Sequence, residues 1–234
     1  MVMRIILLVF TASLAANVAF AISRVDWLLP VALLVGWYLA DFASGAVHLY
    51  MDYRPCRPGI GFHTLYFYAG DRSAPAYQSL RQQVMARAGA FERLVYDFKN
   101  HHPRPDALGR RSMATQIGST VAAVTLPVSL LLNITCAFAP LPGWLVAATL
   151  SLIVGGTFAQ YFHGTLHRNT NPWIILALRR TGLLMSPAAH QKHHDSLKRD
   201  FATNSGWSNA LINPIFAYLH RHGWLTDAGL EPVS

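Results

Sequence analysis

The chain contains little cysteine and little charge. Cys56 and Cys136 are the two cysteines among its 234 residues. Two cysteines give no disulfide framework and no Cys-rich zinc site, so any metal must be held by histidines and carboxylates. Charged residues make up 13% of the chain, about half the usual share. Too little polar material remains to cover a water-facing surface, and we therefore expect a membrane protein.

The apolar residues are concentrated in long runs. Hydrophobic residues make up 53% of the chain, and a bilayer-spanning helix needs about 20 of them in succession. The stretch Pro172–Met185 is shorter and is interrupted by Arg179 and Arg180, so it predicts a helix lying in the membrane interface. We find no repeat, and we expect one all-α membrane domain over residues 1–234, with spans at residues 5–22, 27–50, 116–139 and 144–162.

The first apolar run has two interpretations. Arg4, the run itself and the small residues Ala19–Ala21 resemble a secretory signal peptide, in which case residues 1–21 would be removed. Basic residues favour a retained span, because ten of the 19 Lys and Arg residues lie in the loop 53–115 and seven lie in the tail 163–234. The positive-inside rule then predicts a multi-pass protein with both termini, this loop and this tail in the cytoplasm. In a bacterial host the membrane would be the inner membrane.

The net charge of +8 follows from the same distribution. A basic balance is also typical of proteins that bind nucleic acid, but charge alone is weak evidence for that function. In a membrane protein it reports cytoplasmic loops next to anionic headgroups. We therefore expect lipid, and no nucleic acid, as a partner.

Histidines gather on the predicted cytoplasmic side. His190, His193 and His194, in HQKHH, span roughly 100° of one face if they form a helix. His163 and His167 are one helical turn apart just after the fourth run. Histidine is the commonest metal-binding side chain, so the convergence predicts a metal site. The other histidines on this side include His48, His101 and His102.

Polar residues near these histidines are candidates for supporting roles. A carboxylate inside a span is costly unless it is paired, and Asp41 lies seven residues before His48. We expect Asp41 to accept the free ring N–H of a ligand histidine; a purely structural hydrogen bond is the alternative. Gly45 would let another helix approach. Asp52 and Gln160 are further candidates for a ligand or an orienting partner.

Three histidines are expected outside the site. His63 is predicted in a loop, and His220 and His222 are predicted to decorate an interfacial helix. The remaining set still exceeds the four ligands of one zinc ion and would serve two metals. Nitrogen and carboxylate ligands without thiolates fit iron, among other metals. A dinuclear iron centre at the membrane rim suits O2 activation against a lipid C–H bond.

Other classes predict different patterns. A metal transporter would need histidines and aspartates spread through the bilayer, and a b-type haem protein would need paired histidines at matched depth in facing spans. A non-catalytic scaffold would not need converging imidazoles. Desaturation and hydroxylation share one ligand set and remain open.

Four ordered motifs resemble the Kua/CarF family of membrane lipid desaturases. The family includes plasmanylethanolamine desaturase and a plant chloroplast desaturase acting on phosphatidylglycerol. Its DFxSGxxHWxxD motif corresponds to DFASGAVHLYMD, with Leu49 at the tryptophan position. Its other motifs correspond to FKNHHPRP at residues 98–105, GTFAQYFHGTLH at 156–167 and HQKHHDSLKRDFATNSGW at 190–207. The segment Tyr53–Tyr96 is longer than this family leads us to expect.

The resemblance implies an iron- and O2-dependent desaturase acting near the headgroup end of a membrane lipid. Its first-choice reaction forms the vinyl ether of a plasmenyl lipid, and acyl-lipid desaturation is the runner-up. Cytochrome b5 or a ferredoxin would supply electrons. The implied ligands of two iron ions are His48, His101, His102, His163, His167, His190, His193 and His194.

Overall fold

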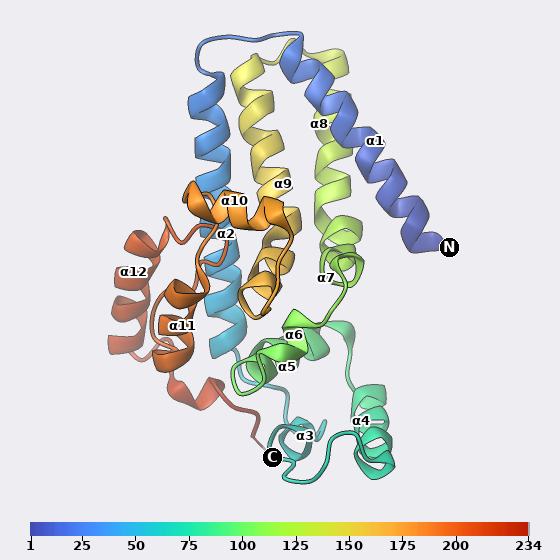
Figure 1. Cartoon of the computed structure of the whole chain (residues 1–234), viewed down its shortest axis with the longest axis vertical. Helices are drawn as coiled ribbons and strands as arrows, with labels where there is room; N and C mark the ends of the chain where they lie inside the picture. The colour runs from blue at the N-terminus through green and yellow to red at the C-terminus, as the bar shows by residue number, and fades with distance from the viewer. Residues whose placement is uncertain (234) are drawn as a thin grey trace.

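The computed structural model describes residues 1–233, which form helices and connecting segments without a strand (Figure 1). Four helical segments are long and apolar enough to cross a membrane. They are α1 (Val2–Ile22), α2 (Leu29–Tyr53), the segment Met113–Phe138, and α9 (Gly143–Leu166). The predicted all-α architecture with four spans is confirmed. The second and fourth spans extend three and four residues beyond their predicted ends at 50 and 162, which brings Asp52 and His163 onto helices.

The third span changes its winding partway. It consists of α7 (Met113–Thr120), a π-helical segment (Val121–Thr125) and α8 (Leu126–Phe138). Pro127 stands in the first turn of α8. Proline has no N–H, and its ring clashes with the carbonyl four residues earlier, so the helix widens just before it.

Helices α2 and α9 lie against each other along their lengths. A Cβ at Gly36 would clash with the Ala148 carbonyl, and one at Gly155 would press on Ala40. Glycine at these two positions therefore permits the close approach. This pairing is important because both helices end in candidate ligands.

Helix α1 is joined to α8 by a buried polar network. Ser13 and Ser129 share a hydrogen bond of 2.7 Å, and Asn17 donates to the Ser129 hydroxyl at 2.9 Å. Asn133 in turn donates to the Ser13 hydroxyl at 2.7 Å. Such groups are costly in an apolar environment unless they are paired, so their pairing fixes α1 on the bundle.

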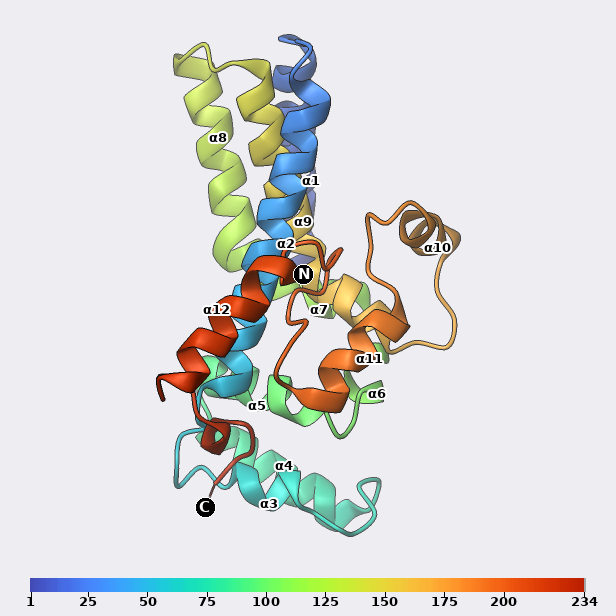
Figure 2. The ribbon, with the colours of Figure 1, turned by 90° about the vertical axis from the view of Figure 1, so that its left-hand side faces the viewer.

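The remaining helices gather around one end of the bundle, where α2 and α9 finish (Figures 1 and 2). We call it the histidine end. The stretch predicted as an interfacial helix forms α10 (Trp173–Arg180), which crosses the flank of the spans. The other helices at this end are α3 (Phe62–Tyr66), α4 (Pro75–Arg87), α5 (Ala90–His101), α6 (Asp106–Gly109), α11 (Pro187–Ser196), α12 (Asn209–Arg221) and the short 3-10 helix η2 (Asp227–Gly229).

Candidate metal centre

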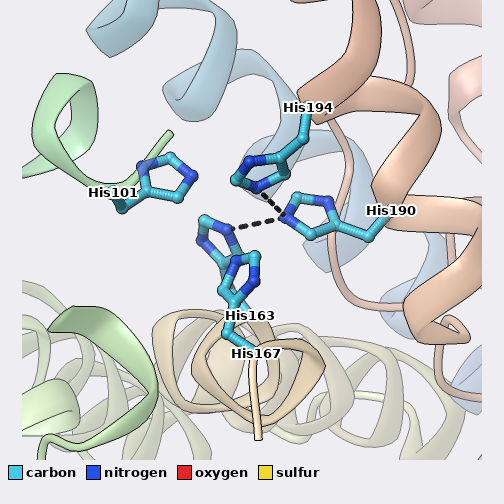
Figure 3. A group of neighbouring side chains, drawn as sticks. All are labelled: His101, His163, His167, His190 and His194. Atoms are coloured by element: carbon cyan, nitrogen blue, oxygen red, sulfur yellow. Dashed lines mark hydrogen bonds between the residues drawn. The ribbon is translucent and has the colours of Figure 1, made fainter. Parts of the chain in front are cut away.

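The eight histidines implied by the motifs, together with Asp52, form two adjoining groups. Within each group, the candidate ligand atoms all lie within 4.8 Å of one another. Ligands bound at about 2.2 Å to one ion lie at most about 4.4 Å apart, so each group is close to the size of one coordination shell. The first group (Figure 3) holds His101, His163, His167, His190 and His194; the second holds His48, Asp52, His102 and His193.

Four chain segments carry these side chains: the ends of α2, α5 and α9, and the helix α11. The last two turns of α2 carry His48 and Asp52, one helical turn apart, and the end of α9 carries His163. His167 is the residue directly after α9. HQKHH lies on α11, so its three histidines share a helix. That helix begins with Pro187 and is capped by Ser186, whose hydroxyl accepts the Ala189 N–H at 3.2 Å.

The two groups share the same volume. The rings of His101 and His102, which belong to different groups, have centroids 4.2 Å apart. The His48 and His163 rings are 4.9 Å apart. The end of α5 and the following residue therefore contribute one ligand to each group, and the arrangement suits two nearby ions.

Backbone carbonyls orient several rings. Nδ1 of His48 lies 2.9 Å from the Phe201 carbonyl, and Nδ1 of His193 lies 2.8 Å from the Arg199 carbonyl. His101 makes the same contact with Phe98. A carbonyl only accepts, so Nδ1 carries the proton and the Nε2 lone pair is free for a metal.

The protein leaves several inward-facing atoms without a full set of hydrogen-bond partners. Nε2 of His190 faces Nε2 of His163 at 3.0 Å and of His194 at 3.1 Å (Figure 3). Both Asp52 carboxylate oxygens, with Nε2 of His48, are buried without a hydrogen-bond partner among residues 1–233. One ring proton can serve only one of the two contacts of His190, so a cation between the rings would satisfy the nitrogen that is left over. These residues fit a metal of the class that takes nitrogen and oxygen ligands.

Burial favours the neutral form of five rings outside the spans. Burial, and then neighbouring histidines, lower the pKa of His167 to about 3 and that of His194 to about 4. The same two causes hold the pKa of three more rings well below the usual value of 6.5. Those rings belong to His101, His102 and His190. A neutral imidazole is the form that binds a metal.

Asp41 does not have the predicted role. Its Oδ1 accepts the N–H groups of Ser205 at 2.8 Å and Gly206 at 3.0 Å. Its Oδ2 accepts the N–H and the hydroxyl of Ser208, at 2.9 and 2.7 Å. These bonds occupy both oxygens, so Asp41 stabilises the turn before α12 and does not orient a ligand histidine. Backbone carbonyls, instead of Asp41, orient the ligand histidines.

The other expectations have mixed outcomes. Gly45 is closely approached by Ile212 of α12 and by Ala202, as predicted. Gln160 lines a small cavity with His101 but belongs to neither ligand group. His63 also lies in neither group, and it stands on α3 rather than in a loop. His220 contacts Asp227 at 2.9 Å at the end of α12.

Sequence reasoning overlooked Lys99, a fully buried lysine on α5. Its ammonium donates to the carbonyls of Met51, at 3.3 Å, and Asp52, at 2.7 Å, which lie in the last turn of α2. It also donates to the Gly229 carbonyl. Burial lowers the pKa of Lys99 to about 8. The position of Lys99 inside FKNHH was the available signal: the lysine joins the helix that carries His101 to the helix that carries Asp52.

We expect Lys99→Met to lower metal content at both groups. Three buried carbonyls would lose their donor, which costs on the order of 1–3 kcal/mol for each unsatisfied group. The position of α2 relative to α5 would then no longer be fixed. Metal analysis and thermal unfolding of the purified protein measure the two effects. Lys192→Met, at an exposed lysine on α11, is the control. Full metal loading of Lys99→Met would contradict this role.

Two relatives and one family model are similar to the chain. A plasmanylethanolamine desaturase of Myxococcus xanthus is 26% identical over 210 residues, covering 88% of this chain and 64% of the relative. A protein of Arabidopsis thaliana, fatty acid desaturase 4, chloroplastic, is 25% identical over 181 residues, covering 75% of this chain and 45% of the relative. The chain thus spans less than two thirds of either relative's length. No solved structure matches it.

The family model is described as a lipid desaturase domain and matches residues 83–222. The matched region begins in α4 and contains seven of the eight clustered histidines; His48, on α2, precedes it. Because the match covers more than half of the chain, this protein belongs to the lipid desaturase family.

Proposed function

We propose that this protein is an iron- and O2-dependent desaturase that introduces a double bond near the headgroup end of a membrane lipid chain. One observation carries the proposal. Two adjoining groups of largely buried imidazoles, with one carboxylate, stand where two spans of a four-helix membrane bundle end. Family membership gives independent support.

The donor atoms favour iron. Both groups offer imidazole nitrogen, the second group adds the Asp52 carboxylate, and both cysteines lie outside them. Non-haem iron commonly binds to such a ligand set. Bound iron would supply the redox chemistry for O2 activation, while the chain supplies ligands and a dry pocket. His101, His163, His167, His190 and His194 would hold one ion, and His48, Asp52, His102 and His193 would hold the other.

The depth of the ligands favours chemistry near the headgroup. Asp52 is the penultimate residue of α2, and His163 is three residues from the end of α9. The ligands therefore lie at the level where the spans leave the apolar layer, and the first carbons of a lipid chain are the easiest to reach. In the loops at the opposite end, residues 23–28 and 139–142, Arg24 is the one basic residue. The positive-inside rule then favours a cytoplasmic active site.

The gathering of ligands at one end also argues against the transporter alternative. A transport path needs polar sites at successive depths of the bilayer, whereas these two groups share one depth. Metal analysis of purified protein tests the choice. About two irons per chain, without haem or zinc, are expected for the desaturase.

Conversion of a plasmanyl to a plasmenyl lipid is the preferred reaction, because the DFASGAVH and GTFAQYFHGTLH stretches fit the family motifs. We expect a host that expresses this chain and is fed alkyl ether lipids to accumulate acid-labile vinyl ether lipids. Lipid mass spectrometry before and after acid treatment measures the product. His163→Ala expressed at the same level is the control.

The similarity to the chloroplastic fatty acid desaturase favours acyl-lipid desaturation as the second candidate. That activity would appear as a new double bond close to the carboxyl end of an acyl chain, without vinyl ether. A double bond near mid-chain, or a hydroxylated lipid, would refute both candidates.

A further inference from the structure

A basic cleft of about 680 Å³ opens between α4 and the segment formed by α5 and α6. Figures 1 and 2 place α4 beyond α5, on the side away from the spans. The cleft therefore faces the aqueous phase and not the bilayer. Its lining includes two aspartates, Asp97 and Asp106, against five arginines: Arg72, Arg81, Arg104, Arg110 and Arg111.

Four of the arginines divide into two kinds, and the fifth, Arg111, pairs with Asp97 at 2.9 Å. Arg72 and Arg104 donate to backbone carbonyls of the residues around α3 and thereby build the wall. Arg110 lies 3.6 Å from Asp106 with three quarters of its side chain exposed, and Arg81 makes no ion pair or side-chain hydrogen bond within residues 1–233. The guanidinium groups of Arg81 and Arg110 are available to an acidic ligand.

The cleft adjoins the candidate metal centre. Asn100 and Pro103 line it, and they are the chain neighbours of His101 and His102, which belong to different ligand groups. Neighbouring Cα atoms are about 3.8 Å apart. A cavity of about 10 Å³, which is room for roughly one water, lies between His101, Gln160 and the cleft residues Asn100 and Arg111. The cleft is thus separated from both groups by one turn of chain.

The proposed reaction needs electrons from outside. Removing two hydrogens from a –CH2–CH2– unit yields two electrons and two protons, whereas reducing one O2 to two waters takes four of each. Two electrons and two protons must therefore enter for every double bond formed. Since the chain itself holds no reductant among its residues, a separate one-electron carrier must dock within reach of the ligands twice in each turnover.

We propose, resting on the proposed desaturase function, that this cleft is the docking site of a small acidic electron-carrier protein. Charge complementarity selects an acidic partner, and the position away from the spans selects a water-soluble domain. One wall of the cleft, with Arg72 and Arg81, precedes the family-model match, which begins at residue 83. That wall belongs to the segment that is longer than expected, so it suits the partner of this particular chain.

Charge reversal tests the site. The double variant Arg81→Glu with Arg110→Glu alters the cleft, and Arg57→Glu with Arg87→Glu makes the same charge change at exposed residues outside its lining. Each protein is assayed in nanodiscs of zwitterionic lipid with reduced ferredoxin, with reduced cytochrome b5, and with dithionite plus a mediator. We expect the KM for the effective carrier to rise at least tenfold in the cleft variant alone. Dithionite-driven turnover should stay at the wild-type level in both variants.

Salt provides a second measurement. At 0.1 M ionic strength, salt screens the attraction between charges that are more than about 10 Å apart. Added salt should therefore raise the wild-type KM for the carrier and leave that of the cleft variant nearly constant. An unchanged KM in the cleft variant would overturn the docking site while dithionite-driven turnover upheld the desaturase. Loss of dithionite-driven turnover in that variant, or a defect seen only in nanodiscs rich in anionic lipid, would also overturn it. Failure of the wild type with every reductant would instead refute the proposed function.

Discussion

Replacing His163 or His193 by alanine is expected to abolish lipid desaturation while the protein still inserts into the membrane. His163 belongs to the five-histidine group and His193 to the group with Asp52. Losing an orienting partner of a metal ligand already costs about 10–100-fold, so losing a ligand should lower turnover by more than about 100-fold. Product mass spectrometry measures turnover, and metal analysis should show about one ion fewer in each variant.

Two other histidines provide matched controls. His220 and His222 stand at the end of α12, where they contact Asp227 and the Tyr218 carbonyl. Alanine at either position should leave most of the activity, since neither belongs to a ligand group. Near-normal product from His163→Ala or His193→Ala would refute the metal assignment, and complete loss in either control would mean that the site extends further.

Asp52→Asn should have a similarly large effect by changing charge alone. Asp52 is fully buried and supplies the one carboxylate of the two groups within residues 1–233. Its oxygens lie 3.4, 3.5 and 3.3 Å from Nε2 of His48, His102 and His193. An asparagine keeps the shape but carries no negative charge to balance a cation. We expect turnover to fall more than about 100-fold and one metal ion to be lost.

Asp195→Asn is the control, because Asp195 is an exposed carboxylate on α11 that accepts a hydrogen bond from Gln191 at 2.8 Å. Thermal unfolding of metal-free protein separates a binding defect from a folding defect. The metal-free Asp52→Asn variant should unfold at or above the wild-type temperature, since it no longer buries an unpaired carboxylate. Full metal content together with full activity in Asp52→Asn would exclude Asp52 as a ligand.

The sequence by itself determined the spans and the local parts of the site. Runs of apolar residues long enough for a bilayer require helices, because the membrane leaves backbone groups no other partners. The spacings of His48 with Asp52, and of the three histidines in HQKHH, determined which side chains share a helix face. The order of the four motifs indicated the family, which the family model confirmed.

The tertiary structure alone decided how those parts combine. The division of the ligands into two groups depends on contacts between residues far apart in sequence, such as His102 with His193 at 3.3 Å. Asp41 was misjudged for this reason: its spacing to His48 was visible, but the turn at Ser205–Ser208, more than 160 residues later, takes its oxygens. The lysine joining α2 to α5 and the cleft beside α4 have the same origin. Helical periodicity fixes neighbours within one helix, whereas packing between helices depends on which surfaces fit together.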